Sequence, residues 1–301
     1  MKLHPVVAFA AWFATWTGAV AEPVAHPFVC TDYTAGALCR VAADGTVTRL
    51  ADAPASNDLW ILPGGNILFV TGHGVKELAP DGRVVFAYES TSGVYACQRL
   101  ANGNTFVAEC EAGRLLEVTP AGSVAKEIRL LAEGQDGGHA YLRNARVLAN
   151  GNYLVAHYGL GVVREYDSAG RPVREIPAPG GPHSAVRLPD GNTLIAIADG
   201  DRNPRVIEVD PVGTIVWQLT QADVPEVRLA FMTGLQRLPN GNTVLTNWLG
   251  HGQLGRGPHV VEVTRDKRVV WTYADHAAFK TISSILLLDI PGDCTKGEIL
   301  H

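Results

Sequence analysis

Hydrophobic and polar positions alternate along most of this chain, in short runs separated by turn residues. One pattern recurs five times: a hydrophobic segment, a turn that ends in Gly-Asn, and a second hydrophobic segment. Its copies are residues 62–69, 100–107, 148–155, 188–195 and 238–245. Alternation with a period of two is typical of β-strands, and Asn-Gly supplies the positive φ of a two-residue type I′ hairpin turn. The pattern therefore predicts five equivalent β-hairpins, and repetition of this kind indicates a repeat architecture.

A second turn follows each hairpin, so each unit holds four strands, which we call a, b, c and d in chain order. The turns between strands c and d number six, and they lie at Asp44-Gly45, Asp81-Gly82, Ala121-Gly122, Ala169-Gly170, Val212-Gly213 and Asp266-Lys267. The glycines of the a–b turns are 38 to 50 residues apart. Four-stranded units of this length are typical of β-propeller blades.

The two chain ends complete the blade that lacks an a–b hairpin. Residues 281–289 supply its strand a, and residues 27–31, 37–41 and 46–50 supply strands b, c and d. The sequence therefore predicts an all-β fold, a six-bladed β-propeller of four-stranded antiparallel blades, closed by N- and C-terminal strands in one blade. Such closure removes exposed sheet edges.

Loop lengths distinguish the two faces of the predicted disc. The a–b and c–d turns are tight in every unit, so the variation in length falls on the b–c and d–a connections. In an antiparallel blade these two connections emerge at the same edge. Because loops on a rigid scaffold usually carry binding groups, we expect this elaborated face to be the working face. The opposite face is expected to show only turn residues.

Residues 1–21 have the pattern of an export leader. Lys2 precedes an apolar run, and Ala19-Val20-Ala21 is a small-residue cleavage signal. The run is too short to favour a membrane-spanning helix, although an uncleaved anchor is the alternative. We expect cleavage near Ala21, a periplasmic or secreted protein, and a single propeller domain over residues 22–301 with no membrane span. A net charge of −5 without a basic run argues against nucleic acid as a partner.

The five cysteines fit an oxidising compartment. Cys30 and Cys39 flank one turn, where they can face each other across a hairpin. Cys97 and Cys110 flank another but are out of register, so their pairing is less clear, and the pairing of Cys294 stays open. No Cys-x-x-Cys motif occurs, which argues against a thiolate metal site or a redox dithiol.

Candidate functional residues gather at the mouth of the central channel on the elaborated face. Strand a is innermost, and one residue stands eight positions before each a–b turn glycine: Asn57, Tyr95, Arg143, His183 and Thr233. The ends of the b strands bring further residues to the same rim: His73, Glu109, Glu111, His157, Tyr158, Asp199, Asp201, Arg202, Asn247, Trp248 and His251. The long d–a loops add His139 and Arg228.

These residue types point to ligand binding or to histidine chemistry. Arginines bind anions, and Trp248 can stack on an aromatic or sugar ligand. Histidines bind metals, accept protons or act as nucleophiles. The predicted ligand-binding residues are Arg143, Asn144, His73, Glu109, Tyr95, Asn57, Asp58, Trp248, Asn247 and Arg202. No cofactor is predicted firmly. A divalent metal is the open alternative, with candidate ligands at His73, His139, His157 and His183.

The repeated Leu-Pro-Asn/Asp-Gly-Asn-Thr-Leu hairpin, an acidic strand c and a Gly-x-x-x-Trp strand d resemble the quinoprotein-like repeat superfamily of propellers over residues 55–275. Within that superfamily, the chain is most similar to bacterial arylsulfate sulfotransferase-type propellers. In that family a His–Asp pair opens an inner strand. Here the pair is split: Ser184 follows His183, while Asp58 follows Asn57.

The resemblance implies sulfuryl transfer between phenols through a sulfated histidine, with His183 as the nucleophile. Arg143 and Asn144 are placed by geometry as holders of the sulfate oxygens, and His139 or His157 as the acid for the leaving phenol. Quinoprotein dehydrogenases of this superfamily have eight blades. Bound pyrroloquinoline quinone is therefore not expected in a six-bladed ring.

Three hypotheses about function follow. In the first, the elaborated face binds a small molecule or a periplasmic protein, with or without catalysis. The second is arylsulfate sulfotransferase-like transfer through His183, with His139 and His157 as further catalytic candidates. The third is a metal-assisted lyase or hydrolase that acts on an acidic saccharide.

Overall fold

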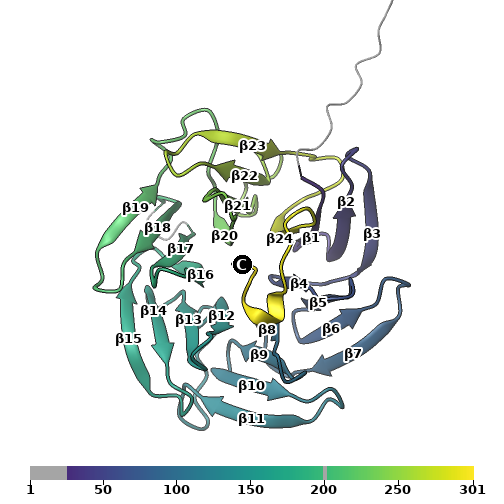
Figure 1. Cartoon of the computed structure of the whole chain (residues 1–301), viewed down its shortest axis with the longest axis vertical. Helices are drawn as coiled ribbons and strands as arrows, with labels where there is room; N and C mark the ends of the chain where they lie inside the picture. The colour runs from purple at the N-terminus through teal and green to yellow at the C-terminus, as the bar shows by residue number, and fades with distance from the viewer. Residues whose placement is uncertain (1–25, 199–201) are drawn as a thin grey trace, which may run out of the picture.

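The computed structural model describes residues 26–198 and 202–301. The predicted leader and the predicted rim residues Asp199 and Asp201 lie outside this part of the chain. The rest forms six four-stranded antiparallel sheets arranged around a central axis (Figure 1). The predicted six-bladed β-propeller is therefore confirmed. Within the described residues, no helix is long and apolar enough to cross a membrane.

Five blades are continuous in sequence. Blade 1 holds β4 (Leu59–Ile61), β5 (Ile67–Val70), β6 (Gly74–Leu78) and β7 (Val84–Glu89). Blade 2 holds β8 (Val94–Arg99), β9 (Thr105–Glu109), β10 (Arg114–Val118) and β11 (Val124–Arg129). Blade 3 holds β12 (Asn144–Val147), β13 (Tyr153–His157), β14 (Val162–Tyr166) and β15 (Pro172–Pro177). Blade 4 holds β16 (Pro182–Arg187), β17 (Thr193–Ile197), β18 (Arg205–Val209) and β19 (Ile215–Leu219). Blade 5 holds β20 (Met232–Arg237), β21 (Thr243–Asn247), β22 (Val260–Val263) and β23 (Val269–Tyr273).

The sixth blade joins the two ends of the chain, as predicted. Its innermost strand is β24 (Ile282–Leu287), which pairs with β1 (Phe28–Asp32), and β2 (Ala37–Val41) and β3 (Val47–Asp52) follow outward. The antiparallel register places Phe28 opposite Leu287. Hydrogen bonds between β1 and β24 thus close the ring.

Burial falls from the axis to the rim of the disc. Strands such as β5, β9 and β17 are buried at every position, because neighbouring blades cover both of their faces. The outer strands, such as β7 and β11, alternate between exposed and buried residues. This difference explains why the b strands of the sequence are almost continuously hydrophobic while the d strands alternate.

The a–b turns differ from the type I′ turns that the sequence predicts. In four of the five hairpins only the final glycine has a positive φ, between 82° and 88°, at Gly103, Gly151, Gly191 and Gly241. The amide of each glycine donates to the carbonyl three residues earlier, as in Gly191 to Leu188 at 3.0 Å. This is a type I turn followed by a glycine bulge, a three-residue hairpin loop. Pro189, at the first central position, favours it because its ring fixes φ near −65°.

Glutamates in strand c connect neighbouring blades. Glu165 accepts hydrogen bonds from Asn152 of its own hairpin at 2.7 Å and from Arg187 of the next blade at 2.8 Å. Glu208 does the same with Asn192 at 2.9 Å and Arg237 at 2.8 Å. The acidic strand c and the arginine before the Leu-Pro motif are therefore parts of one repeated inter-blade ion pair.

The face opposite the mouth carries more than the predicted turn residues. After β24 the chain crosses the end of the channel, through a short 3₁₀ helix η1 (Cys294–Lys296), to His301 at the centre of the ring (Figure 1). The carbonyl of Leu300 accepts the amide of Arg237 at 2.9 Å. No sequence pattern predicts this segment, because it is short and its hydrophobic residues follow neither the helical nor the strand period.

A buried ion pair lies where this terminal segment meets the channel. Arg146 donates to both carboxylate oxygens of Asp58 at 2.8 Å and to the His301 carbonyl at 2.8 Å. Its guanidinium lies over the Trp60 ring, 4.9 Å from the centroid. Burial raises the pKa of Asp58, but the charges and hydrogen bonds of Arg146 and His301 together outweigh it and lower that pKa below its usual range.

All five cysteines are buried free thiols in this structure. Cys30 and Cys39 lie directly opposite each other in β1 and β2, as the sequence predicts. Cys97 is opposite Val107, so Cys110 has no place across from it.

Candidate functional site

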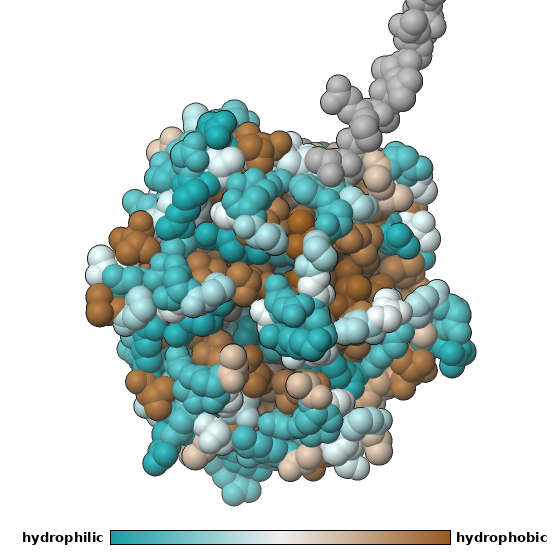
Figure 2. All heavy atoms as spheres, viewed as in Figure 1, coloured by the Kyte–Doolittle hydropathy of each residue, from teal (hydrophilic) through white to brown (hydrophobic). Residues whose placement is uncertain are grey.

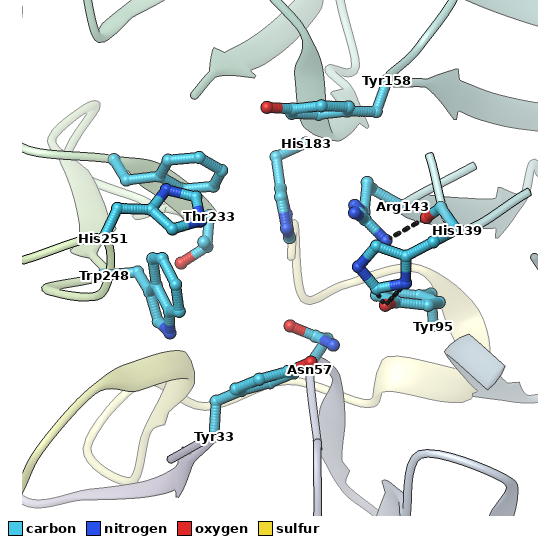
Figure 3. A pocket seen from close by; sticks show the side chains of 11 residues that line it. Tyr33, Asn57, Tyr95, His139, Arg143, Tyr158, His183, Thr233, Trp248 and His251 are labelled. Atoms are coloured by element: carbon cyan, nitrogen blue, oxygen red, sulfur yellow. Dashed lines mark hydrogen bonds between the residues drawn. The ribbon is translucent and has the colours of Figure 1, made fainter. Parts of the chain in front are cut away.

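A cavity of about 250 Å³ opens at the mouth of the channel, on the face formed by the b–c and d–a connections. We call it the mouth pocket, and Figure 3 shows its side chains arranged around an open centre. All six blades or their connecting loops contribute to it. Its lining residues are Tyr33, Asn57, Tyr95, His139, Arg143, Tyr158, His183, Phe231, Thr233, Trp248 and His251.

The repeat itself builds half of this lining. All five residues that stand eight positions before an a–b turn glycine lie here: Asn57, Tyr95, Arg143, His183 and Thr233. Equivalent positions in equivalent strands point the same way, so five blades each direct one side chain to the mouth. In Figure 3 the His183 imidazole and the Asn57 amide point toward the centre.

Aromatic rings form one wall of the mouth pocket. Trp248 packs edge-on against Phe231, with ring centroids 5.2 Å apart, and against Tyr33 at 6.1 Å. The b–c loop can hold this indole only because residue 250 is glycine: a Cβ there would lie 1.8 Å from the Trp248 ring. Likewise a Cβ on Gly181 would lie 2.6 Å from the Tyr158 ring.

Arg143 provides the positive charge of the opposite wall. Its guanidinium lies 4.5 Å from the centroid of the Tyr95 ring and 5.2 Å from that of Tyr158. It also donates to the His139 carbonyl, and the Tyr95 hydroxyl contacts the His139 Nδ1 at 2.9 Å (Figure 3). Two rings and a backbone acceptor thus fix the guanidinium before any ligand arrives.

The electrostatics of the mouth pocket favour an anion. Burial, followed by the charge of Arg143, lowers the pKa of His183 to about 3, and the same two causes lower that of His139. Both imidazoles are therefore neutral at pH 7. No described lining residue is acidic. The nearby carboxylate of Glu111 is occupied by the Ser92 hydroxyl at 2.9 Å and the Gly93 amide.

Three residues predicted for the rim are buried instead. His157, Glu109 and Asn247 are each the last residue of a strand b, and all three have no exposed surface. Strand alternation turns the last residue into the blade, whereas the next residue faces the mouth, as Tyr158 and Trp248 do.

The contacts of these buried residues are structural. His157 lies 2.8 Å from the Tyr166 hydroxyl through Nε2, and burial lowers its pKa to about 4. Glu109 accepts from the Ser90 hydroxyl at 2.7 Å and from Arg114. The side-chain oxygen of Asn247 accepts the Ala230 amide at 2.7 Å, and its nitrogen donates to the carbonyls of Arg228 and Pro258, each at 2.8 Å, which joins two loops of the elaborated face.

Strand alternation also turns two predicted residues of strand a away from the mouth pocket. Asp58 and Asn144 directly follow the pocket residues Asn57 and Arg143, and both are buried and absent from the lining. Asp58 instead forms the ion pair with Arg146 described above. His73 and Arg202 are exposed on b–c connections outside the mouth pocket.

Two lining residues were missed by the sequence reasoning. Phe231 precedes β20 in a long d–a loop and has no distinguishing pattern. The position of Tyr33 in its repeat could have predicted it as a pocket residue. It directly follows strand b of the closing blade, as Tyr158 and Trp248 directly follow strand b of blades 3 and 5.

The four histidines predicted as candidate metal ligands do not converge. His139 and His183 line the mouth pocket, His157 is buried within blade 3, and His73 is exposed elsewhere. Over residues 26–198 and 202–301, no group of three or more His, Cys, Asp or Glu side chains is arranged to hold a metal ion.

The fold and the pocket define a six-bladed β-propeller with an aromatic-walled, arginine-bearing mouth. The sequence matches no protein-family model and no curated protein. Among solved structures, the chain is similar to a protein of unknown function from Bacteroides caccae, with a TM-score of 0.76 and 26% identity over 89% of this chain and 99% of that one.

Two lyase structures also share the fold. A streptogramin B lyase matches with a TM-score of 0.59 and 16% identity over 85% of this chain and 86% of that one. A catalytically inactive histidine-to-alanine variant of virginiamycin B lyase from Staphylococcus aureus, with quinupristin, matches with a TM-score of 0.57 and 14% identity over 84% and 85%. At these identities the likeness shows the fold alone. The resemblance to arylsulfate sulfotransferase-type propellers stays a prediction.

Proposed function

We propose that the protein binds a small aromatic anion in the mouth pocket. The observation that carries this proposal is the guanidinium of Arg143, held between two tyrosine rings in a pocket whose described lining has no acid. A guanidinium fixed in this way offers paired donors to a carboxylate, sulfate or phosphate group. We further propose that this binding takes place outside the cytoplasm, because residues 1–21 have the pattern of an export leader.

The size and walls of the mouth pocket support a ligand with one ring. A cavity of about 150 Å³ in another protein accommodates benzene, and the mouth pocket has about 250 Å³. The difference leaves room for an anionic substituent. Trp248 and Tyr33 supply aromatic faces and edges for the ring, while Asn57 and the neutral His183 supply hydrogen-bonding groups.

Calorimetric titration with benzoate, benzyl alcohol and acetate tests this proposal. Benzoate has both the ring and the charge, and each of the others lacks one of them. We expect benzoate to bind at least about 10-fold more tightly than either, because a hydrogen bond to a charged group contributes about 1.5 to 3 kcal/mol.

The substitution Arg143→Gln should weaken benzoate binding about 10- to 100-fold and leave benzyl alcohol unaffected. The matched control is Arg171→Gln, which removes an exposed arginine that pairs with Asp167. Equal affinities for benzoate and benzyl alcohol, or an Arg143→Gln variant that binds benzoate like the wild type, would contradict the proposal.

Sulfuryl transfer is the second candidate, and the state of His183 favours it. Its pKa of about 3 leaves the imidazole unprotonated at neutral pH, and it shares the mouth pocket with Arg143. In this scheme an imidazole nitrogen attacks the sulfur of an aryl sulfate, the bond from sulfur to the phenolic oxygen breaks, and the phenolate takes a proton from solvent, because His139 is neutral at pH 7. The oxygen of a second phenol then attacks the sulfur, its proton passes to solvent, and the bond from sulfur to nitrogen breaks, which releases the neutral imidazole.

Release of 4-nitrophenolate from 4-nitrophenyl sulfate, with and without a phenol acceptor, tests this second candidate. We expect acceptor-dependent release by the wild type and its loss in His183→Ala. The control His73→Ala, on an exposed loop, should retain full activity. No release by the wild type, or full release by His183→Ala, would remove sulfuryl transfer from consideration without affecting the binding proposal.

A further inference from the structure

The junction between blade 6 and blade 1 differs from the other five in the charge of one strand c residue. The same position of strand c is glutamate in five blades: Glu77, Glu117, Glu165, Glu208 and Glu262. In the closing blade it is Arg40 in β2, which lies opposite Val29, as Glu77 lies opposite Leu68. The charge at this position is therefore reversed in one blade only.

The partner position is also changed at this junction. Glu77, Glu165 and Glu208 receive Arg99, Arg187 and Arg237 from the next blade. The residue of blade 1 that would meet Arg40 in this way is Ile61. The junction between blade 6 and blade 1 thus has neither the acid nor the arginine that join blade 1 to blade 2, blade 3 to blade 4 and blade 4 to blade 5.

A cleft of about 320 Å³ occupies this junction, and we call it the seam cleft. Its walls come from both blades and their turns: Val29, Arg40, Leu50, Ile61, Gly65, Ile67, Leu78, Ala79, Pro80, Gly82 and Leu288. In Figure 2 hydrophobic residues are visible to the right of centre, in the sector where Figure 1 shows β1–β3 beside β4–β7.

Arg40 is the single charged group among the described residues of the seam cleft. Its side chain is exposed, and it has no hydrogen bond or ion pair with any other residue of the described chain. The other described walls are aliphatic side chains, glycine and proline, with no aromatic ring. This composition differs from the aromatic mouth pocket and fits a flexible alkyl chain.

We propose that the seam cleft binds a medium-chain alkyl carboxylate, with its chain between Ile61 and Leu78 and its carboxylate on Arg40. The charge complements the one unpaired cation at the junction, and the chain removes aliphatic surface from water. The site is separate from the mouth pocket: it lies between two blades, and its lining includes the a–b turn residue Gly65 and the c–d turn residue Gly82, which belong to the opposite face.

Calorimetric titration of the full chain with butyrate, hexanoate, octanoate and 1-octanol tests this inference. Each added methylene should tighten carboxylate binding about 4-fold until the cleft is filled. Arg40→Gln should weaken octanoate about 10-fold or more and leave 1-octanol unchanged, because only the charge is removed. Arg268→Gln, which removes an exposed arginine paired with Asp266, is the control.

A second variant restores the repeat at this junction. Arg40→Glu combined with Ile61→Arg should build the ion pair found at three other junctions, abolish octanoate binding and raise the melting temperature. The Arg143→Gln variant should bind octanoate like the wild type. A negative result for the mouth pocket can therefore be distinguished from a negative result for the seam cleft. Octanoate affinity that is unchanged in Arg40→Gln, independent of chain length, or retained in the double variant would overturn the proposal.

Discussion

Replacement of Arg146 by methionine should lower the free energy of unfolding by about 3 to 5 kcal/mol. The guanidinium is the main partner of Asp58, whose side chain is only 1% exposed. Without Arg146, an ionised carboxylate stays buried with the Cys97 amide and His301 as its remaining partners. The arginine also holds the terminal segment, so its removal releases the His301 carbonyl as well.

Urea denaturation of the wild type and the variant measures this effect. Arg268→Met is the matched control, and we expect a loss below about 1 kcal/mol because its ion pair is exposed. The double variant Asp58→Asn with Arg146→Met removes both charges and should recover most of the loss. A single variant that is as stable as the control would show that the buried pair makes no such contribution.

Acidification from pH 7 to pH 4.5 should destabilise the protein well before its carboxylates are protonated. His157, His183 and His259 are buried, and burial is the main cause that lowers their pKa values to about 4, 3 and 4. Histidine in an unfolded chain has a pKa of about 6.5, so the unfolded state binds protons first as the pH falls. The contribution of these neutral histidines to the free energy of unfolding is therefore fully present above about pH 6.5 and decreases toward pH 4. At pH 4.5 we expect the decrease to be about 2 to 3 kcal/mol per histidine.

The variant His157→Gln isolates one of these contributions. Glutamine keeps a hydrogen-bonding group near the Tyr166 hydroxyl but does not titrate. Chemical denaturation at both pH values measures the decrease in the free energy of unfolding between pH 7 and 4.5. We expect this decrease to be smaller by about 2 kcal/mol in His157→Gln than in the wild type. His73→Gln, on an exposed loop, should leave the loss unchanged. An identical pH dependence in His157→Gln and the wild type would refute this account.

The sequence predicts the ring well because the repeat leaves few choices. Six c–d turns and five hairpins require that residues 281–289 meet the N-terminal strands, and the register of Phe28 with Leu287 confirms it. The turn type was wrong because the Asn-Gly signal is shared by two hairpin classes. Pro189, which favours a type I turn, was the residue that distinguishes them.

The site was predicted in part, and the errors within the strands have one physical origin. Strand a was read in the correct register, so Arg143 and His183 line the mouth pocket. The end of strand b was not assigned to a single residue, so both His157 and Tyr158 were predicted at the rim, and only Tyr158 lines the mouth pocket. Neighbouring residues of a strand face opposite ways, and the sequence does not state where the strand ends. The Arg146–Asp58 pair joins residues 88 apart, which no local pattern indicates.

The closing blade combines strands from both ends of the chain, so the ring can close only after β24 has been synthesised. The strands β1–β3 leave the ribosome first, but their inner neighbour β24 is made near the end of the 301-residue chain. Until then β1 has an open edge whose amides and carbonyls can pair with another chain. Blades 1 to 5 can each form soon after translation, since their four strands are contiguous. Until β24 has been synthesised, the nascent protein is therefore an unclosed arc in which the inner edge of β1 is unpaired.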